Sequence, residues 1–279
     1  MHLPYITLPS LDLSVVGLGQ LDWFALFVFA AIVAGVATYD YAISRGGDVE
    51  RGAARVLPEM VVVGGFVGAH LVHVLAYHPE LMRDDPWVLL KVWAGMSSVG
   101  GFAGAAVAAV LTLRWRRQPF VPYADRLVFG LTAGWVFGRL GCTTAHDHPG
   151  LPTSFILGVA YPDGVRHDLG LDELLFTVLL VAPVLLFLSR RPWRSGTLVG
   201  AWLLLYGSGR FFLDFLRATD RSFVDARYFG LTPAQYACVL MAAAGALLLA
   251  RARRSTAAKQ PALWGARMQR DLQSARDVV

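Results

Sequence analysis

The sequence predicts an all-α, polytopic membrane protein with about seven transmembrane helices, its N-terminus outside and its C-terminus in the cytoplasm. Hydrophobic residues make up 56% of the 279 residues and charged residues only 16%, which is more apolar than an ordinary soluble domain. Apolar runs of about 20 residues, the length that crosses roughly 30 Å of hydrocarbon, recur from about Leu21 to about Leu249. Arginines gather at every second connection between these runs, which gives the orientation.

Seven spans are expected, near residues 21–43, 57–77, 87–113, 125–141, 171–189, 197–216 and 230–250. The first run follows a polar, Pro-containing leader and has no A-x-A-like cleavage site at its end. We therefore expect a retained span and not a removed signal peptide.

The loops between the spans alternate in charge. Three arginines follow each of the first, third and fifth spans: Arg45, Arg51 and Arg55; Arg114, Arg116 and Arg117; Arg190, Arg191 and Arg194. The loops after the second, fourth and sixth spans are acidic or mixed. Because Lys and Arg collect on the cytoplasmic side of short loops, the pattern predicts a multi-pass chain with its N-terminus outside and its C-terminus in the cytoplasm.

We expect one transmembrane helical domain over residues 1–250, with a short outer-face segment near 142–170 and a basic cytoplasmic tail over 251–279. The tail could lie on the inner leaflet as an amphipathic segment or be weakly ordered. We favour weak order, because its apolar residues are too sparse for a strong stripe.

The excess of basic residues in the chain is explained more simply by contact with lipid than by contact with nucleic acid. The isoelectric point is about 9.5, but the arginines cluster at span ends, where anionic lipid headgroups meet them. We therefore expect membrane lipids as partners and no nucleic acid. Cys142 and Cys238 fall in or beside different apolar segments, which argues against a disulfide framework.

Glycine is dense in two apolar segments, GGFVGAHLVH and AGMSSVGGFAGAA. Small residues let helices approach closely or let a helix break. We favour close helix packing as the reason for these glycines.

Three charged residues lie within or at the ends of predicted spans, namely Arg139, Arg210 and Asp214. Each ionised group costs roughly 2.5 to 3.5 kcal/mol in a membrane, so a compensating partner is required. Arg210 and Asp214 are four residues apart on one predicted helix and can form an ion pair. That pair does not account for Arg139, which lies on a different span.

Two guanidinium groups from separate helices form a site suited to an anion, because the planar fork of arginine matches phosphate oxygens. The abundant phosphate of a membrane is a lipid headgroup. We therefore expect a lipid phosphate between the fourth and sixth spans, with Asp214 orienting an arginine.

The stretch GRLGCTTAHDHPG, from Gly138 to Gly150, holds a thiol, two imidazoles and a carboxylate: Cys142, His146, Asp147 and His148. His70 and His73 share a face of the second span. With Cys142, these histidines could be metal ligands, but their spacing is not that of a known zinc motif. We favour acid–base chemistry or polar packing, expect no metal or cofactor, and favour an inert thiol at Cys142 over a reactive one.

Several of these segments together resemble the bacterial prolipoprotein diacylglyceryl transferases. The similar segments run in order from D-W-F-A-L at residues 22–26 through AGMSSVGG, GRLGCTTAHDHPG and RHDLGLDE to YGSGRFFLDFLRATD and GLTPAQ. The motif Y-G-x-x-R-F-x-x-[ED]-F-x-R-x-x-D, starting at Tyr206, is the most specific of them. The resemblance implies a seven-span inner-membrane enzyme with an outside N-terminus.

The resemblance also implies a reaction. The diacylglyceryl group of phosphatidylglycerol moves to the lipobox cysteine thiol of a preprolipoprotein, and glycerol phosphate leaves. Arg139 and Arg210 match the phosphate-site arginines of the family, and Asp214 stands where a glutamate is usual. Gly138, Gly141 and Gly150 match signature glycines. We expect phosphatidylglycerol and the lipobox peptide as partners.

This chain departs from the family at several polar positions. Cys142 replaces an asparagine, Asp147 a glutamate, Phe24 a tyrosine and Val99 a histidine. In one interpretation, histidines that the family does not usually carry supply the missing base. The expected catalytic residues are then His146, Asp147, His148 and Asp214, and the expected substrate-binding residues are Arg139, Arg210, Gly138, Gly141, Gly150, His70 and His73.

In a second interpretation the bundle binds phospholipid headgroups but has lost transfer or uses another acceptor. We favour the first, because a decayed site should not keep the costly intramembrane charges. An intramembrane serine protease and a transporter are further alternatives. Neither GMSSVGG nor YGSGR gives G-x-S-x-G, however, and the reactive residues gather toward one face and not at the midplane.

Overall fold

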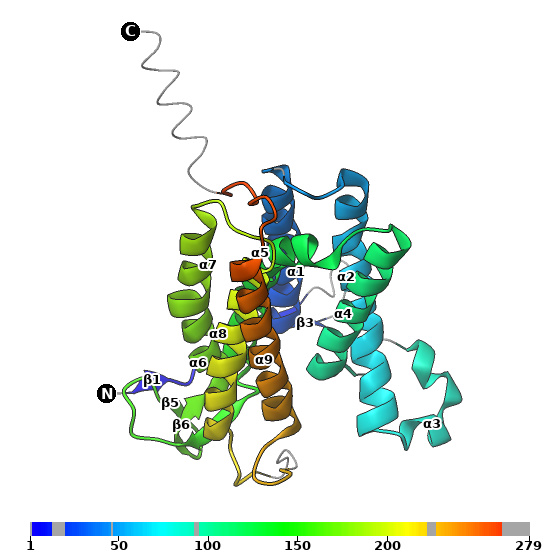
Figure 1. Cartoon of the computed structure of the whole chain (residues 1–279). Coiled ribbons are helices and arrows are strands. Elements are labelled where there is room, and N and C mark those ends of the chain that lie inside the picture. The colour runs from blue at the N-terminus through cyan, green and yellow to red at the C-terminus, as the bar shows by residue number, and fades with distance from the viewer. Residues whose placement is uncertain (1, 13–19, 46, 92–94, 222–226, 264–279) are drawn as a thin grey trace. The chain divides into compact units, whose positions relative to one another are not determined.

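The computed structural model of the chain describes residues 2–12, 20–45, 47–91, 95–221 and 227–263 (Figure 1). These residues are mostly helical. Among them, helices long and apolar enough to cross a membrane cover Trp23–Ser44, Arg51–Ala76, Leu169–Ser189 and Pro233–Arg254, and a shorter apolar helix covers Val99–Trp115. The protein is therefore a polytopic membrane protein.

The helices are α1 (Trp23–Ser44), α2 (Arg51–Val72), α3 (Leu81–Asp84), α4 (Ser98–Trp115), α5 (Phe120–Ala145), α6 (Leu169–Phe176), α7 (Ala182–Ser189), α8 (Thr197–Leu213) and α9 (Pro233–Arg254). Short π-helical turns extend α2 over His73–Tyr77 and join α6 to α7 over Thr177–Val181. Turns of 3-10 helix cover Pro86–Leu90 and Asp214–Leu216.

A helix lies in each of the seven predicted ranges, but the third begins late. In the span expected near 87–113 the α-helix begins at Ser98, where the Ser97 side chain caps the first turn of α4. The preceding residues form α3 and the 3-10 turn, because Asp85 caps Trp87 and Pro86 begins the turn. The predicted start of this span is therefore wrong.

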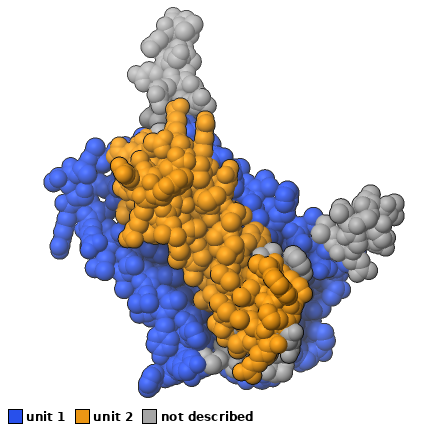
Figure 2. Space-filling view, turned by 90° about the vertical axis from the view of Figure 1, so that its right-hand side faces the viewer, with its two compact units in different colours: residues 1–45, 125–279 blue, residues 46–124 orange. Residues whose placement is uncertain are grey.

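The described residues divide into two compact units, which Figure 2 colours separately; one boundary follows α1 and the other falls within α5. The second unit, residues 46–124, is built on α2 and α4. These helices meet at glycines: a Cβ at Gly68 would lie 2.5 Å from the carbonyl oxygen of Gly100, and one at Gly104 would lie 2.1 Å from that of Gly64. The glycine-rich segments thus serve close helix packing, as expected.

The first unit holds α1, most of α5 and α6 to α9, with α8 and α9 side by side (Figure 1). It also holds a four-stranded sheet in the order β1 (Leu3–Pro4), β5 (Val159–Tyr161), β6 (Gly164–Asp168), β4 (Pro149–Pro152). β1 runs parallel to β5, and the other pairs are antiparallel. A two-stranded sheet joins β2 (Leu11–Asp12) and β3 (Gln20–Leu21).

The sheet corrects the all-α prediction. The expected outer segment near 142–170 contains β4, β5 and β6, and β5 and β6 form a hairpin at Pro162 and Asp163. Asp163 and the following Gly164, at φ +129°, supply the turn chemistry. The strands are only three to five residues long, too short to give an alternating pattern.

The tail also differs from its prediction as far as residue 263. α9 continues to Arg254, and Trp193 and Gln260 exchange backbone hydrogen bonds of 3.3 and 2.7 Å. Arg126 donates to the Gln260 side chain at 3.0 Å, and Leu263 is fully buried. The expectation of weak order is wrong for residues 251–263, and residues 264–279 lie outside the described part of the chain.

Candidate functional site

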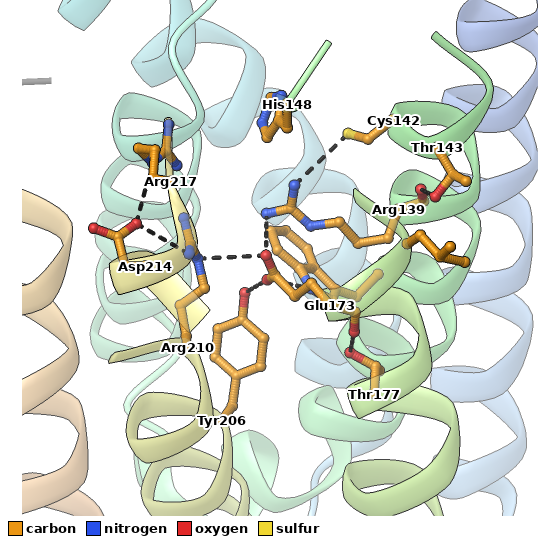
Figure 3. A network of polar contacts seen from close by, with 12 residues as sticks. Arg139, Cys142, Thr143, His148, Glu173, Thr177, Tyr206, Arg210, Asp214 and Arg217 are labelled. Carbon is orange, nitrogen blue, oxygen red and sulfur yellow. Dashed lines mark hydrogen bonds and ion pairs between the residues drawn. The ribbon is translucent and has the colours of Figure 1, made fainter. Parts of the chain in front are cut away.

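Two buried arginines from separate helices meet at one carboxylate in the first unit (Figure 3). Arg139 on α5 places Nη2 2.9 Å from Oε2 of Glu173 on α6, and Arg210 on α8 places Nε 3.3 Å from the same oxygen. Arg139 is 8% exposed, Arg210 9% and Glu173 1%. The two guanidinium groups that the sequence placed on different spans are thus brought together.

The second oxygen of Glu173 is also bonded. Oε1 accepts from the indole Nε1 of Trp135 at 3.1 Å and from the hydroxyl of Tyr206. The Thr177 hydroxyl donates to the Glu173 carbonyl at 2.8 Å, where the π-helical turn between α6 and α7 begins. These contacts fix the carboxylate between α5, α6 and α8.

Glu173 was not among the residues predicted for the site. It falls in the segment RHDLGLDE, to which the family resemblance extends, but no role was expected of it. A signal was available, since it is a carboxylate near the start of an apolar segment, where an ionised group needs a partner. Glu173 therefore meets the same criterion as Asp214.

Asp214 holds a second group of cations. Its Oδ1 lies 3.0 Å from Nη1 of Arg210, the predicted i,i+4 pair, and 3.3 Å from Nε of Arg217. Its Oδ2 accepts from the hydroxyl of Thr232. Three guanidinium groups therefore face two carboxylates across the cluster of Arg139, Glu173, Arg210, Asp214 and Arg217, which we call the arginine cluster.

Arg139 has donor capacity beyond its ion pair. Its guanidinium stacks over the Trp135 ring, with 4.5 Å from Cζ to the ring centroid, and its Nη1 lies 3.7 Å from Sγ of Cys142. Its Nε is buried and has no hydrogen-bond partner among the described residues. A buried donor without a partner costs free energy, so this atom suits an acceptor that enters the site.

Beside Arg139 lies a cluster of three further groups, which we call the Cys142 cluster. Sγ of Cys142, a carboxylate oxygen of Asp147 and a ring nitrogen of His148 all lie within 4.8 Å of one another. Nδ1 of His148 is 2.8 Å from Oδ1 of Asp147, and both side chains are about one third exposed. Figure 3 shows Cys142 and His148 on the same side of the Arg139 guanidinium.

His146 is directed away from that cluster. It ends α5 in the left-handed conformation, at φ +51°, and its Nδ1 lies 2.8 Å from Oδ2 of Asp168. Its Nε2 lies 3.2 Å from the carbonyl oxygen of Ile6, and its ring stacks on Tyr5 at 4.1 Å. Both ring nitrogens are therefore used within the fold, where His146 ties the segment that follows β1 to the end of α5.

Tyr161 completes this contact by donating to the same Asp168 oxygen at 2.8 Å. Burial and the neighbouring Asp168 carboxylate raise the pKa of the Tyr161 hydroxyl, so it stays a proton donor. The other oxygen of Asp168 caps α6 by accepting from the Leu171 amide at 3.1 Å. Asp168 thus joins the sheet, the end of α5 and the start of α6.

His70 and His73 belong to the second unit and are described with it alone. Nδ1 of His70 lies 3.1 Å from the carbonyl oxygen of Gly95, and Nε2 lies 2.8 Å from that of Val88. His73 packs against Gly95, where a Cβ would come within 2.1 Å of Nε2. These contacts fit polar packing, and a role in substrate binding stays a prediction.

The three signature glycines have different surroundings. A Cβ at Gly141 would lie 3.0 Å from Cβ of Phe27 on α1, and one at Gly150 would lie 2.7 Å from the Leu216 carbonyl oxygen. No described atom lies within 4 Å of a Cβ placed at Gly138. Gly141 and Gly150 are explained by packing, whereas Gly138 leaves a bare patch on α5 one residue before Arg139.

Comparison with known proteins finds similarity to one family over most of the chain. The model of the prolipoprotein diacylglyceryl transferase family matches residues 13–251. A phosphatidylglycerol–prolipoprotein diacylglyceryl transferase of Cereibacter sphaeroides is 30% identical over 267 residues, which cover 84% of this chain and 91% of the relative. One of Chromohalobacter salexigens is 30% identical over 256 residues, covering 89% and 95%. One of Mannheimia succiniciproducens is 28% identical over 277 residues, covering 93% and 100%. The chain therefore belongs to the prolipoprotein diacylglyceryl transferase family.

Proposed function

We propose that this chain transfers the diacylglyceryl group of phosphatidylglycerol to the lipobox cysteine thiol of preprolipoproteins. The family and the names of the relatives support the reaction class. The observation that carries the proposal is the meeting of Arg139 and Arg210, from separate helices, at the buried carboxylate of Glu173. A cluster of this kind suits the phosphate of a lipid headgroup.

The arginine cluster holds the phosphate in this proposal. Arg139 offers the unpartnered Nε, and each guanidinium can turn part of its fork from Glu173 to the phosphate oxygens. Glu173 and Asp214 keep the arginines in place before the lipid arrives, so Asp214 acts by positioning Arg210. Charge that develops on the leaving phosphate is then stabilised by groups already oriented toward it.

The Cys142 cluster serves the acceptor thiol. The thiol sulfur forms a bond to the glycerol carbon, the bond from that carbon to the phosphate oxygen breaks with its electron pair, and glycerol phosphate leaves. The thiol must lose its proton, because the thiolate is the nucleophile. Among the two histidines after α5, His148 with Asp147 suits this task, because both nitrogens of His146 are bonded within the fold.

We also propose the membrane arrangement that the charge pattern predicts. Seven helical segments cross a bacterial inner membrane as one transmembrane domain over residues 1–250, with the N-terminus outside. The segment near 142–170 lies on the outer face, and residues 251–279 lie in the cytoplasm. A helix in each predicted range supports this arrangement, as do the arginines at alternate connections.

A second candidate function is phospholipid headgroup binding without this transfer, or with another acceptor. Three departures from the family pattern favour it: Phe24 has no hydroxyl, Val99 has no imidazole and Cys142 has no amide. It shares the arginine cluster with the first candidate and differs in the fate of the bound lipid.

A transfer assay separates these candidates. Purified protein in vesicles is given labelled phosphatidylglycerol and a lipobox peptide, and label on the peptide is measured over time. We expect transfer by the wild type and about 100-fold or greater loss in Arg139→Lys and Arg210→Lys, since lysine keeps the charge but loses the fork. Arg253→Lys, at an exposed position on α9, is the matched control and should keep the wild-type rate.

The melting temperature of each variant shows whether it is folded. Transfer at the wild-type rate by folded Arg139→Lys and Arg210→Lys would contradict the assignment of the arginine cluster. Absence of transfer by the wild type, with phosphatidylglycerol still bound, would favour the second candidate.

A further inference from the structure

We propose that the Cys142 cluster is a zinc site that activates the acceptor thiol, an inference that rests on the proposed function. Cys142 lies in the last turn of α5, whereas Asp147 and His148 follow the end of that helix. The thiol, the carboxylate and the imidazole nevertheless lie within 4.8 Å of one another. Thiolate sulfur, imidazole nitrogen and carboxylate oxygen are the three ligand types that zinc takes in proteins. Their spacing is not that of a known zinc motif, because the convergence depends on the end of α5 before His146.

The distances require a small closure of the cluster. Zinc bonds of about 2.3 Å to sulfur and about 2.0 to 2.2 Å to nitrogen and oxygen put tetrahedral donors roughly 3.4 to 3.6 Å apart. The widest pair of the Cys142 cluster therefore has to close by about 1 Å or a little more, and the contact of 2.8 Å between Asp147 Oδ1 and His148 Nδ1 has to open. Asp147 and His148 lie between the end of α5 and the start of β4, where neither helix nor strand holds the backbone. Rotation of their side chains can supply that movement.

The local charges also suit a divalent cation. A Cys142 thiolate and the Asp147 carboxylate together neutralise one zinc ion. Arg139 does not bind the metal but donates a hydrogen bond to one of its ligands, because its Nη1 already faces the Cys142 sulfur at 3.7 Å. Its own charge is balanced by Glu173 at 2.9 Å, which limits its repulsion of the metal.

Three protein ligands leave a fourth position open, the arrangement of catalytic zinc sites. We place the acceptor thiol there. In this arrangement His148 binds the metal and is not the proton acceptor. Coordination releases the thiol proton to water, and the bound sulfur donates its electron pair to the glycerol carbon while the carbon–oxygen bond to phosphate breaks. The Arg139 guanidinium contacts the Cys142 sulfur and also belongs to the arginine cluster, so nucleophile and leaving phosphate would lie on either side of one side chain.

Metal binding by the full-length protein in detergent tests the site without any activity. The protein is stripped with a chelator, loaded with Zn²⁺ or Co²⁺, and its metal content and the cobalt absorption spectrum are measured. We expect about one metal ion per chain and a thiolate-to-cobalt charge-transfer band. Cys142→Ser and His148→Ala should weaken zinc binding by about 100-fold or more, and Cys238→Ser, the matched cysteine control, should bind like the wild type.

Absence of bound metal, or a cobalt spectrum without the thiolate band, would overturn the site. Cys142→Ser nearly preserves the side-chain volume, and its melting temperature shows that lost binding is not lost folding. The histidine variant must agree with it for the site to stand.

Transfer in chelator separates this inference from the proposed function. We expect chelation to abolish transfer and Zn²⁺ to restore it. Full transfer by metal-free protein would overturn the inference and leave the proposed function intact, with His148 as the proton acceptor. Zinc binding without transfer under any condition would overturn the proposed function and the catalytic use of the metal.

Discussion

Replacement of Glu173 by glutamine tests the arginine cluster most deeply, because it removes a buried charge and keeps the side-chain shape. Glutamine can still accept from Trp135 and Tyr206, but Arg139 and Arg210 lose the carboxylate that they share. Removal of one partner from a buried ion pair costs about 3 to 5 kcal/mol, and the retained hydrogen bonds place this variant near 3 kcal/mol. The melting temperature should then fall by roughly 6 to 12 °C.

Phosphatidylglycerol should reverse most of that loss. A ligand present at about 100 times its Kd adds about 2.7 kcal/mol, close to the predicted loss. The gain should be larger for Glu173→Gln than for the wild type, because the wild-type carboxylate competes with the lipid phosphate for the same guanidinium groups.

Thermal unfolding in maltoside micelles, with and without added phosphatidylglycerol, measures both effects. Glu59→Gln, at an exposed position on α2, is the matched control and should unfold like the wild type. An unchanged melting temperature for Glu173→Gln would refute the assignment of Glu173 as the shared counterion. An equal gain from the lipid in variant and wild type would refute the competition between carboxylate and phosphate.

Three further predictions concern the sheet and its contacts. Asp168→Ala removes the cap of α6, which is worth about 1 kcal/mol of stability, and it also removes the partner of His146, so the total loss should be larger. Limited proteolysis of the N-terminal segment measures the loosening of the His146 contact. The Arg166 guanidinium lowers the pKa of Asp220, so their ion pair stabilises fully above the ordinary value of 3.8 and is lost as the pH falls through the lowered pKa. The difference in melting temperature between wild type and Asp220→Asn should therefore vanish in acid. Gly150→Ala should lower the stability by about 1 to 3 kcal/mol, because the new Cβ meets the sheet and the chain after α8.

Each of these has a clear contrary result. Gly138→Ala is the control for Gly150→Ala and should fold as well as the wild type, since its new Cβ has open space. If both glycine variants lose equal stability, packing does not explain Gly150. An N-terminal segment equally resistant to protease in Asp168→Ala, or a pH-independent effect of Asp220→Asn, would contradict the corresponding contact.

The helical part of the fold could be predicted because burial in a membrane imposes long apolar segments that the sequence shows directly. The strands could not, because β1 has two residues and its pairing with β5 joins segments more than 150 residues apart. The start of the third predicted span is wrong for a local reason, since apolar composition continues through residues 86–90 where Pro86 and Asp85 set a 3-10 turn.

A site residue could be predicted where a charged side chain lies in an apolar segment, because the free-energy cost of that charge requires a partner. Arg139, Arg210 and Asp214 were found in this way, and Glu173 meets the same criterion. His146 and His148 could not be separated, because they are equivalent in the sequence and differ only in their tertiary partners. Asp168 on β6 pairs with His146, and Asp147 pairs with His148.

The central claim is that phosphate binding at the arginine cluster leads to alkylation of a cysteine. Mass spectrometry of a lipobox peptide, after incubation with the wild-type protein in phosphatidylglycerol vesicles, tests it most directly. We expect a diacylglyceryl group on the cysteine sulfur with one glycerol phosphate released per peptide, and no modification of a peptide with serine in place of cysteine. An unmodified cysteine, with a wild-type protein that is folded and stabilised by phosphatidylglycerol, would contradict the claim.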